Sequence, residues 1–219
     1  MIGVKVETWG DYALFSRPEF KVERCTYEVM TPSAARGILE SIYWHPGMRW
    51  IIDRIYVLNT IQFMNIRRNE VKEVVSGSNA LQVMKGGKKH LELITTRSIA
   101  QRAALALRDV HYVIEAHFEM TNQANETDNP GKFTDIIRRR LKRGSCYSQP
   151  YFGCREFTAH FQAWPEEHSI VTAYANETID LGTMLYDMDY SEPEKIKAQF
   201  FHGILDNGVL DLRKVKVSS

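Results

Sequence analysis

Five basic side chains gather within six consecutive positions in the second half of the chain. They are Arg138, Arg139, Arg140, Lys142 and Arg143. Such clustering favours phosphate binding, because counterions are released from a polyanion where positive charges converge. Three further lysines lie within residues 85–89, around a pair of glycines. Both clusters are also compatible with surfaces that simply face water, as charge runs on helices and loops usually do.

The stretch that follows the basic run, residues 144–157, combines glycines with aromatic side chains. Glycine lets a backbone approach a phosphate chain closely, and aromatic rings provide stacking platforms for unpaired bases. The combination predicts contact with single-stranded or stem-flanking RNA, and the alternative is a structural turn after a solvated helix. The residues expected to contact RNA are Arg138, Arg139, Lys142, Arg143, Gly144, Tyr147, Tyr151 and Arg155.

The cysteine and acidic residues do not form the patterns of a metal site. Cys25, Cys146 and Cys154 form no CxxC pair, no His/Cys set has zinc-ligand spacing, and no acidic cluster suggests a metal nuclease. We therefore expect neither a metal nor another cofactor. Three thiols cannot all pair within one chain, so a reducing cytoplasm is the expected compartment.

The composition is that of a globular protein with one large domain, or one domain and a small appendage. The chain has 219 residues, of which 44% are hydrophobic and 25% charged, and its net charge is only +1. The N-terminus alternates apolar and charged residues, which is typical of a strand and not of a signal peptide. No apolar run reaches the roughly 20 residues that cross a bilayer, so we expect no membrane contact.

Alternation of apolar and polar residues predicts strands, and apolar repeats every three or four residues predict helices. The predicted elements are, in order, a strand at 3–9 that ends at Gly10-Asp11, a helix between Thr31 and His45, one long or two consecutive strands at 50–68, a strand at 109–120, a helix at 131–143 and a strand at 155–163. Between about 69 and 107 the pattern weakens, and this stretch is predicted to be an exposed insertion.

The order β-α-β-β-α-β is that of an α+β, ferredoxin-like (RRM-like) domain. We assign this domain to residues 1–163, with the long insertion at about 69–107. Residues 164–219 are expected to form a small β-rich C-terminal appendage. Within it, Asp206-Asn207-Gly208 predicts a tight hairpin turn.

Five short strings carry a resemblance to a known family. They are TWGDYALFSRPEF near the N-terminus, ESIYW at the end of the first helix, DVHYVIEAHFE, NPGKF and GSCYSQPYFGCREF. From residue 4 to about residue 212 the chain resembles the CRISPR-associated Cas family-five proteins of type I-C (the Dvulg subtype). These belong to the RAMP superfamily of RNA-binding ferredoxin-like proteins, so the resemblance implies the same fold.

The resemblance also implies a dedicated endoribonuclease of CRISPR antiviral defence. Such a protein cuts repeat RNA at the base of its hairpin without a metal, by attack of a 2′-hydroxyl that leaves a cyclic phosphate. It then retains the 5′ handle of the guide RNA as a subunit of the type I-C interference complex, or Cascade. The alternative is a non-catalytic RNA-binding scaffold of that complex, and the basic clusters leave open a general affinity for duplex DNA.

The family's catalytic tyrosine and lysine fall on Tyr43 and Lys132, but the histidine that normally follows the lysine is replaced by Phe133. Histidine suits proton transfer because its ordinary pKa lies near 6.5. Three interpretations stay open: cleavage runs on Tyr43 and Lys132 alone, another histidine substitutes, or the protein binds its RNA and cuts poorly. The candidate substitutes are His117, taken first, and then His111, His160 and His45. Phe133 begins the apolar stripe of its helix, so we expect its side chain to point inward.

Overall fold

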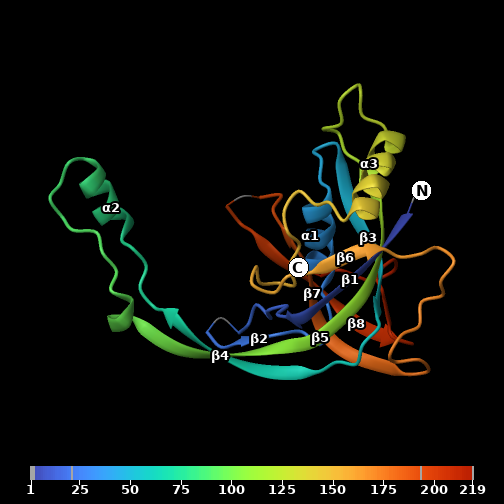
Figure 1. The fold of residues 1–219 in the computed structure, drawn as a ribbon, viewed down its shortest axis with the longest axis horizontal. Helices are drawn as coiled ribbons and strands as arrows, with labels where there is room; N and C mark the ends of the chain where they lie inside the picture. The colour runs from blue at the N-terminus through green and yellow to red at the C-terminus, as the bar shows by residue number, and fades with distance from the viewer. Residues whose placement is uncertain (1–2, 21, 193, 219) are drawn as a thin grey trace.

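The computed structural model describes residues 3–20, 22–192 and 194–218. Their strands form one large, mostly antiparallel sheet whose main path runs β6-β1-β5-β3-β9-β8-β7, with β2 and β4 both paired to β5. Figure 1 shows a body built on this sheet and a thin arm that extends away from it. Among the described helices, none has both the length and the apolar character that a membrane span requires.

The first strand, β1 (Gly3–Ala13), is longer than the predicted strand at 3–9, and the predicted break at Gly10-Asp11 is wrong. A Cβ atom at Gly10 would lie 2.7 Å from the carbonyl oxygen of Thr158 and 2.9 Å from the ring of Phe152. The glycine therefore allows a neighbouring loop to pack closely while the strand continues. A two-residue strand, β2 (Arg24–Cys25), follows and pairs with β5 in parallel.

The first helix, α1 (Pro32–Ile42), begins where the sequence predicts it. Thr31 is the N-cap, since its hydroxyl accepts the N–H of Ala34 at 3.3 Å, and Pro32 occupies the first position, where a missing N–H costs nothing. The helix buries one apolar face that includes Ala35, Ile38 and Leu39. The start of the helix therefore follows strong local signals, whereas its end at Ile42 comes before the predicted end at His45.

The predicted strand region at 50–68 consists of two strands, β3 (Met48–Val57) and β4 (Phe63–Val71). The predicted strand at 109–120 is the second half of a 22-residue strand, β5 (Ile99–Met120). The first half of β5 pairs with β4 from Phe63↔Leu107 to Val71↔Ile99. Part of the predicted insertion is therefore regular strand and not loop.

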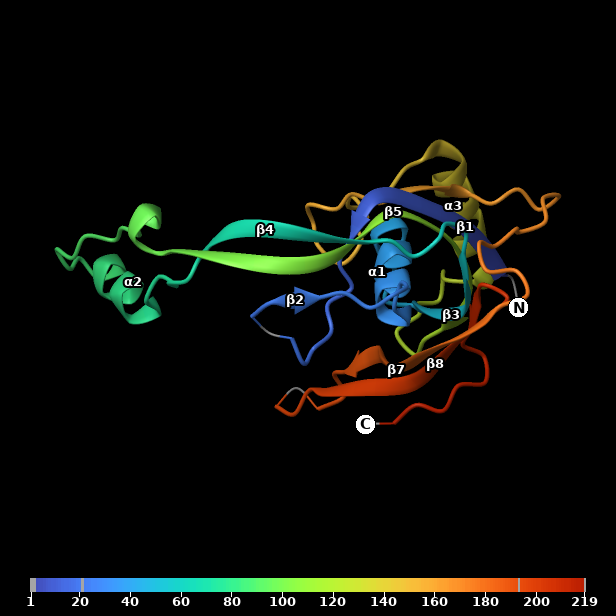
Figure 2. The ribbon, with the colours of Figure 1, turned by 90° about the horizontal axis from the view of Figure 1, so that it is seen from below.

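These paired strands form the stem of the arm that Figures 1 and 2 show. Its tip carries the helix α2 (Gly77–Met84), whose residues are all at least partly exposed, and the 3-10 turn η1 (Thr95–Arg97). The arm is an extension of β4 and β5, so its base is fixed by the central sheet.

The second predicted helix is α3 (Pro130–Arg143). The Asn129 side chain caps it by accepting the N–H of Lys132 at 2.9 Å, and Gly144 ends it in the left-handed region with φ 63°. Phe133, Ile137 and Leu141 form its buried stripe, as their spacing predicts.

The strand predicted at 155–163 is only β6 (His160–Ala163), and residues before it form a loop. An isolated bridge between Tyr151 and Thr158 closes this loop, and the rings of Phe152 and Phe157 are buried. The predicted alternation at this point is therefore replaced by a compact loop that is anchored to the core by its aromatic residues.

The C-terminal region is β-rich, with β7 (Thr178–Asp189), β8 (Lys197–Asp206) and β9 (Val209–Asp211). The predicted hairpin turn is present, because Asn207 (φ 51°) and Gly208 (φ 73°) join β8 to β9 with positive φ angles. Strand β9 then pairs with β3, so these strands continue the main sheet.

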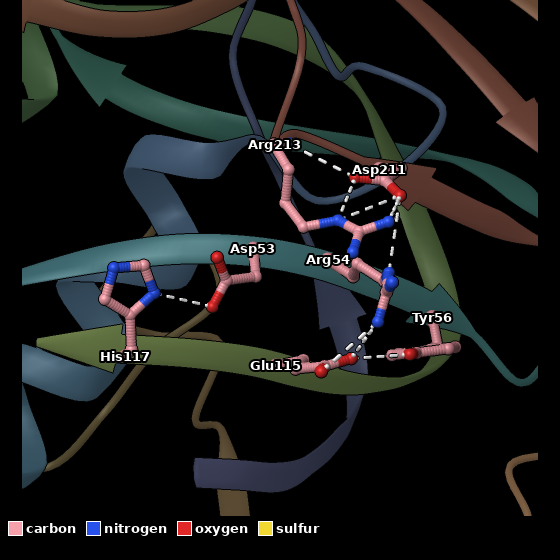
Figure 3. Close-up of polar contacts among 7 residues, drawn as sticks. All are labelled: Asp53, Arg54, Tyr56, Glu115, His117, Asp211 and Arg213. Atoms are coloured by element: carbon pink, nitrogen blue, oxygen red, sulfur yellow. Dashed lines mark hydrogen bonds and ion pairs between the residues drawn. The ribbon is translucent and has the colours of Figure 1, made fainter. Parts of the chain in front are cut away.

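The two faces of the central sheet differ. Helices α1 and α3 contact each other over the face that carries Trp50 and Phe118, whose rings lie 6.0 Å apart. Neighbouring strand residues point to opposite faces, so His117 and Glu115 lie on the other face. Figure 3 shows that face, where acidic and basic side chains from β3, β5 and the C-terminal segment pair with one another.

Candidate active site and RNA-binding surface

Tyr43 is the residue at which α1 ends. Its N–H donates to the carbonyl of Leu39 at 2.9 Å, and its own carbonyl accepts the indole N–H of Trp50 at 2.9 Å. The side chain is only 7% exposed. The backbone and ring of Tyr43 are therefore held firmly between α1 and β3.

The ring of Tyr43 lies beside basic groups of α3. The guanidinium of Arg140 sits 5.1 Å from the ring centroid and also donates to the carbonyl of Ile42. Burial raises the pKa of the Tyr43 hydroxyl above its ordinary value, although the positive charges of Lys132 and Arg140 oppose this. The phenol is therefore protonated at neutral pH and suits a hydrogen-bond donor better than a base.

Lys132 lies in the first turn of α3. Its Nζ is 2.9 Å from Oδ1 of Asp128, whose side chain has no solvent exposure. The hydrogen bond from Lys132 holds the pKa of the Asp128 carboxyl below its ordinary value, so this carboxylate is negatively charged at neutral pH. The positive end of the helix dipole adds to the cation, and the two together favour an anion such as a phosphate.

Phe133 is completely buried, as the apolar stripe predicts. Its ring centroid lies 6.1 Å from those of Tyr43 and Phe118 and 5.0 Å from that of His45. The side chain at this position is thus part of the core beneath the candidate site. No proton-transfer group stands at position 133 itself.

His45 is the candidate histidine that the structure brings next to Lys132. Its Nδ1 is 3.7 Å from Oδ2 of Asp128, the same carboxylate that holds Lys132 through Oδ1. Sequence reasoning named His45 as one of four candidates and did not identify Asp128. The one available signal for Asp128 was its position four residues before Lys132, a spacing at which side chains meet across a helix start.

The other three candidate histidines have different partners. His117 is 2.8 Å from Asp53 on the face opposite Phe118 (Figure 3). His111 is 2.8 Å from Glu7, and His160 stacks on Trp9 with ring centroids 5.7 Å apart. The structure therefore does not bring His117 to the face on which Phe133 and Tyr43 meet.

The residues expected to contact RNA lie along the last two turns of α3 and the loop after it. All eight are exposed: Arg138, Arg139, Lys142, Arg143, Gly144, Tyr147, Tyr151 and Arg155. The N–H groups of Tyr147 and Ser148 donate to the carbonyl of Ser41 at 2.9 and 3.1 Å. Since Ser41 lies two residues before Tyr43, this contact ties the basic and aromatic surface to the candidate site.

Together these groups can perform acid–base and electrostatic chemistry on a phosphodiester. Lys132 supplies a fixed positive charge, Tyr43 a hydroxyl donor and His45 an imidazole. Within residues 3–20, 22–192 and 194–218, no group of three His, Cys, Asp or Glu side chains could hold a metal ion.

Comparison with known proteins reveals the same family along the whole chain. A family model described as CRISPR-associated protein (Cas_Cas5) matches residues 3–213. A protein of Mannheimia succiniciproducens named CRISPR pre-crRNA endoribonuclease Cas5d is 44% identical over 214 residues, which cover 95% of this chain and 94% of that protein. A protein of the same name from Thermus thermophilus is 41% identical over 192 residues, which cover 88% of this chain and 76% of that protein.

Solved structures share the fold. A structure described as that of a CRISPR-associated protein superposes with a TM-score of 0.72 at 23% identity, covering all of this chain and 97% of the other. A chain from a CRISPR RNA-guided surveillance complex superposes with a TM-score of 0.50 at 10% identity, covering 99% of this chain and 89% of the other. From the family match and the two close relatives, the chain belongs to the Cas5d family of CRISPR-associated proteins.

Proposed function

We propose that this chain is a metal-independent endoribonuclease that cuts CRISPR repeat precursor RNA at the base of its hairpin. The observation that carries the proposal is the meeting of α1 and α3 at Tyr43 and Phe133, whose ring centroids lie 6.1 Å apart. Phe133 directly follows Lys132, which is paired with Asp128. The basic and aromatic surface that α3 and its following loop expose lies beside that meeting point. The relatives' names, pre-crRNA endoribonuclease, agree with the same activity.

The proposed reaction is an internal transesterification. The 2′-hydroxyl next to the cut attacks the phosphorus, the bond to the 5′-oxygen breaks, and the products carry a 2′,3′-cyclic phosphate and a 5′-hydroxyl. Lys132 stabilises the negative charge that develops on the phosphate oxygens. Tyr43, a protonated phenol at neutral pH, donates a hydrogen bond that orients the scissile phosphate.

The same surface is proposed to keep the product. The arginines and lysines of α3 neutralise the backbone of the 5′ handle, while Tyr147, which is 86% exposed, offers a ring to an unpaired base. Retention of the handle makes the chain a subunit of the type I-C interference complex in the cytoplasm, with repeat RNA and the other subunits as its partners.

The fold proposal is a ferredoxin-like, RRM-like unit within residues 1–163. Its support is the antiparallel path β6-β1-β5-β3, in which the fourth strand of the unit lies beside the first and the third beside the second. The arm is the insertion of this unit, and residues 164–219 are its β-rich C-terminal extension.

A second candidate function is that of a non-catalytic RNA-binding scaffold in the same complex, and Phe133 is the observation that favours it. The buried ring at this position leaves Lys132 without the adjacent histidine of the family. A general affinity for duplex DNA through the basic residues of α3 belongs to this alternative, and it would fall steeply with salt.

One experiment separates the enzyme from the scaffold. The chain is incubated in EDTA with repeat RNA from its own locus, and with the same RNA carrying a 2′-deoxy sugar at the cut position. The proposal predicts cleavage of the first RNA and none of the second, since the deoxy sugar lacks the nucleophile. Tight binding of both RNAs without cleavage would establish the scaffold, and cleavage of both would exclude attack by the 2′-hydroxyl.

A further inference from the structure

The proposed reaction needs a proton donor for the departing 5′-oxygen, and the two residues assigned so far are poorly suited to it. The pKa of Tyr43 is raised, so its hydroxyl releases a proton less readily than an ordinary phenol. Lys132 is bound to Asp128 at 2.9 Å, and its charge is needed at the phosphate. The position after Lys132 holds a buried phenyl ring.

We propose that His45 is that proton donor, an inference that rests on the endoribonuclease function proposed above. The imidazole of His45 is the nearest polar ring to the buried Phe133, at 5.0 Å between centroids. Its Nδ1 lies 3.7 Å from Asp128, which also contacts Lys132. One buried carboxylate therefore stands between the imidazole and the cation.

Asp128 supplies the negative charge that faces His45. A carboxylate 3.7 Å from Nδ1 places a negative charge beside the imidazole ring. A proton donor of this kind acts from its imidazolium form, and a nearby negative charge complements that form. With its pKa below the ordinary value, Asp128 stays negatively charged and does not itself take that proton. The side chain of His45 is 30% exposed, so its ring remains reachable from solvent and by an RNA phosphate.

The loop that carries His45 is held in place from several sides. The N–H of Gly47 donates to Nδ1 of His45 at 3.0 Å, and the N–H of Met48 donates to its carbonyl at 3.0 Å. A Cβ at Gly47 would lie 2.9 Å from Cα of Ala124 and 3.0 Å from Oδ2 of Asp128. The close approach that glycine permits therefore fixes His45 and Asp128 relative to each other.

These contacts define the proton's path. In neutral His45 the N–H of Gly47 occupies Nδ1, so the ring proton sits on Nε2. Protonation of Nδ1 breaks the hydrogen bond from Gly47, turns Nδ1–H toward Oδ2 of Asp128, which is 3.7 Å away, and leaves Nε2–H free to donate. As the bond from phosphorus to the 5′-oxygen breaks, the Nε2 proton passes to that oxygen. The proton of the 2′-hydroxyl passes to water, and water then restores the imidazolium, so the reaction consumes no net proton.

A substrate with a better leaving group tests this role. Single-turnover cleavage is measured for the full chain and for His45→Ala, on repeat RNA and on the same RNA with sulfur in place of the bridging 5′-oxygen at the cut. A thiolate leaves without protonation, so it makes a proton donor unnecessary. His45→Ala is expected to slow cleavage of natural RNA by about 10²–10⁴-fold and to cleave the sulfur RNA within about fivefold of the unmodified chain, about 1 kcal/mol.

His45→Gln serves as a second variant that keeps a polar side chain, and it should behave as His45→Ala does. His202→Ala, at an exposed histidine on β8, is the matched control and should match the unmodified chain on both RNAs. Equal slowing of both RNAs by the His45 variants, or no slowing, would overturn the inference. If the unmodified chain cleaves neither RNA, the proposed function itself fails, and this inference with it.

Discussion

Two histidine–aspartate pairs lie on opposite faces of the central sheet and differ in how tightly they are held. On the sheet face opposite Trp50 and Phe118, which we call the open face, His117 is 2.8 Å from Asp53. In the candidate site His45 is 3.7 Å from Asp128. The first pair belongs to a face where charges pair with one another. The second shares its carboxylate with Lys132 at the start of a helix.

Polar side chains on the open face contact one another in a set that we call the β3–β5 network. Its members are Asp53, Arg54, Tyr56, Glu115, His117, Asp211 and Arg213 (Figure 3). Arg54 contacts Glu115 at 3.0 Å and Asp211 at 3.3 Å, and the Tyr56 hydroxyl donates to Glu115 at 2.6 Å. Burial and the bond to Glu115 raise the pKa of Tyr56 to about 12. The network ties β3 to β5 and to the C-terminal segment.

This difference between the two histidine–aspartate pairs indicates where reactive groups can be sought. In the network, donors and acceptors satisfy one another, so their protons are committed to the fold. In the candidate site, the cation and the imidazole share one carboxylate and keep 41% and 30% of their side chains exposed. The tighter histidine–aspartate pair is therefore assigned to stability, and the looser one to chemistry.

After His45→Ala, the largest expected effect is that of Lys132→Ala on cleavage. Loss of the fixed positive charge should lower the single-turnover rate by about 10²–10³-fold, while the affinity for repeat RNA changes by less than about fivefold, or about 1 kcal/mol. Rate and affinity are measured on the same preparation by gel assay and by filter binding. Lys214→Ala, at an exposed lysine near the C-terminus, is the control. Equal losses in rate and affinity would reduce Lys132 to a phosphate contact.

Glu115→Gln should show the opposite pattern. Removing the charge that Arg54 and Tyr56 share should lower the free energy of unfolding by about 2 kcal/mol, between the values for exposed and for buried ion pairs. Cleavage by the folded variant should not change. Urea unfolding and single-turnover cleavage measure the two quantities, and Glu119→Gln, at a more exposed ion pair, is the control. A cleavage defect in a stably folded Glu115→Gln variant would contradict the division between the faces.

The contribution of Glu115 should also depend on pH. Burial raises the pKa of Glu115, but hydrogen bonds from Tyr56 and Arg54 outweigh this and lower it below its ordinary value. A lowered folded-state pKa means that the stabilisation is complete above the unfolded value of about 4.3 and is lost as pH falls through the folded-state value. The difference in unfolding free energy between the unmodified chain and Glu115→Gln should therefore shrink below about pH 4. A difference that grows on acidification would contradict this assignment.

The smallest expected effect is that of His117→Asn. Asparagine can still hydrogen-bond to Asp53, so the free energy of unfolding should change by no more than about 1 kcal/mol, and cleavage should be unchanged. Thermal unfolding and single-turnover cleavage check both expectations. A large loss of cleavage with the fold intact would transfer the proton-transfer role to the open face and reverse the comparison.

Local signals in the sequence predict the helices well. Thr31 and Pro32 mark the start of α1, and the repeat of Phe133, Ile137 and Leu141 marks the buried face of α3. These signals are local because helical hydrogen bonds join residues four apart. The C-terminal hairpin turn is predicted for the same reason, since Asn207 and Gly208 favour the positive φ angles that the turn adopts.

Features that depend on distant partners were not predictable in this way. The first half of β5 alternates exposed residues with partly buried or buried ones, but the more buried positions hold Ala100, Arg102 and Ala104, so the sequence shows no apolar–polar alternation. The pairing of β9 with β3 joins residues more than 150 positions apart, such as Arg54 and Asp211. No periodicity within either strand encodes such a partner.

The candidate site was likewise predictable from the sequence only in part. Tyr43 and Lys132 came from the resemblance, and the inward direction of Phe133 came from its helix stripe. The sequence offered four histidines and placed His117 first, although a strand or loop histidine carries no mark of what faces it. Only the folded chain brings Asp128 between His45 and Lys132.

Our main proposal is that this chain cleaves RNA by attack of a 2′-hydroxyl without a metal. Its most direct test is the chemistry of the cut ends after incubation with repeat RNA in EDTA, read by mass spectrometry of both fragments. We expect a 2′,3′-cyclic phosphate on the upstream fragment and a 5′-hydroxyl on the downstream one. A 3′-hydroxyl with a 5′-phosphate, or intact RNA that remains bound, would contradict it.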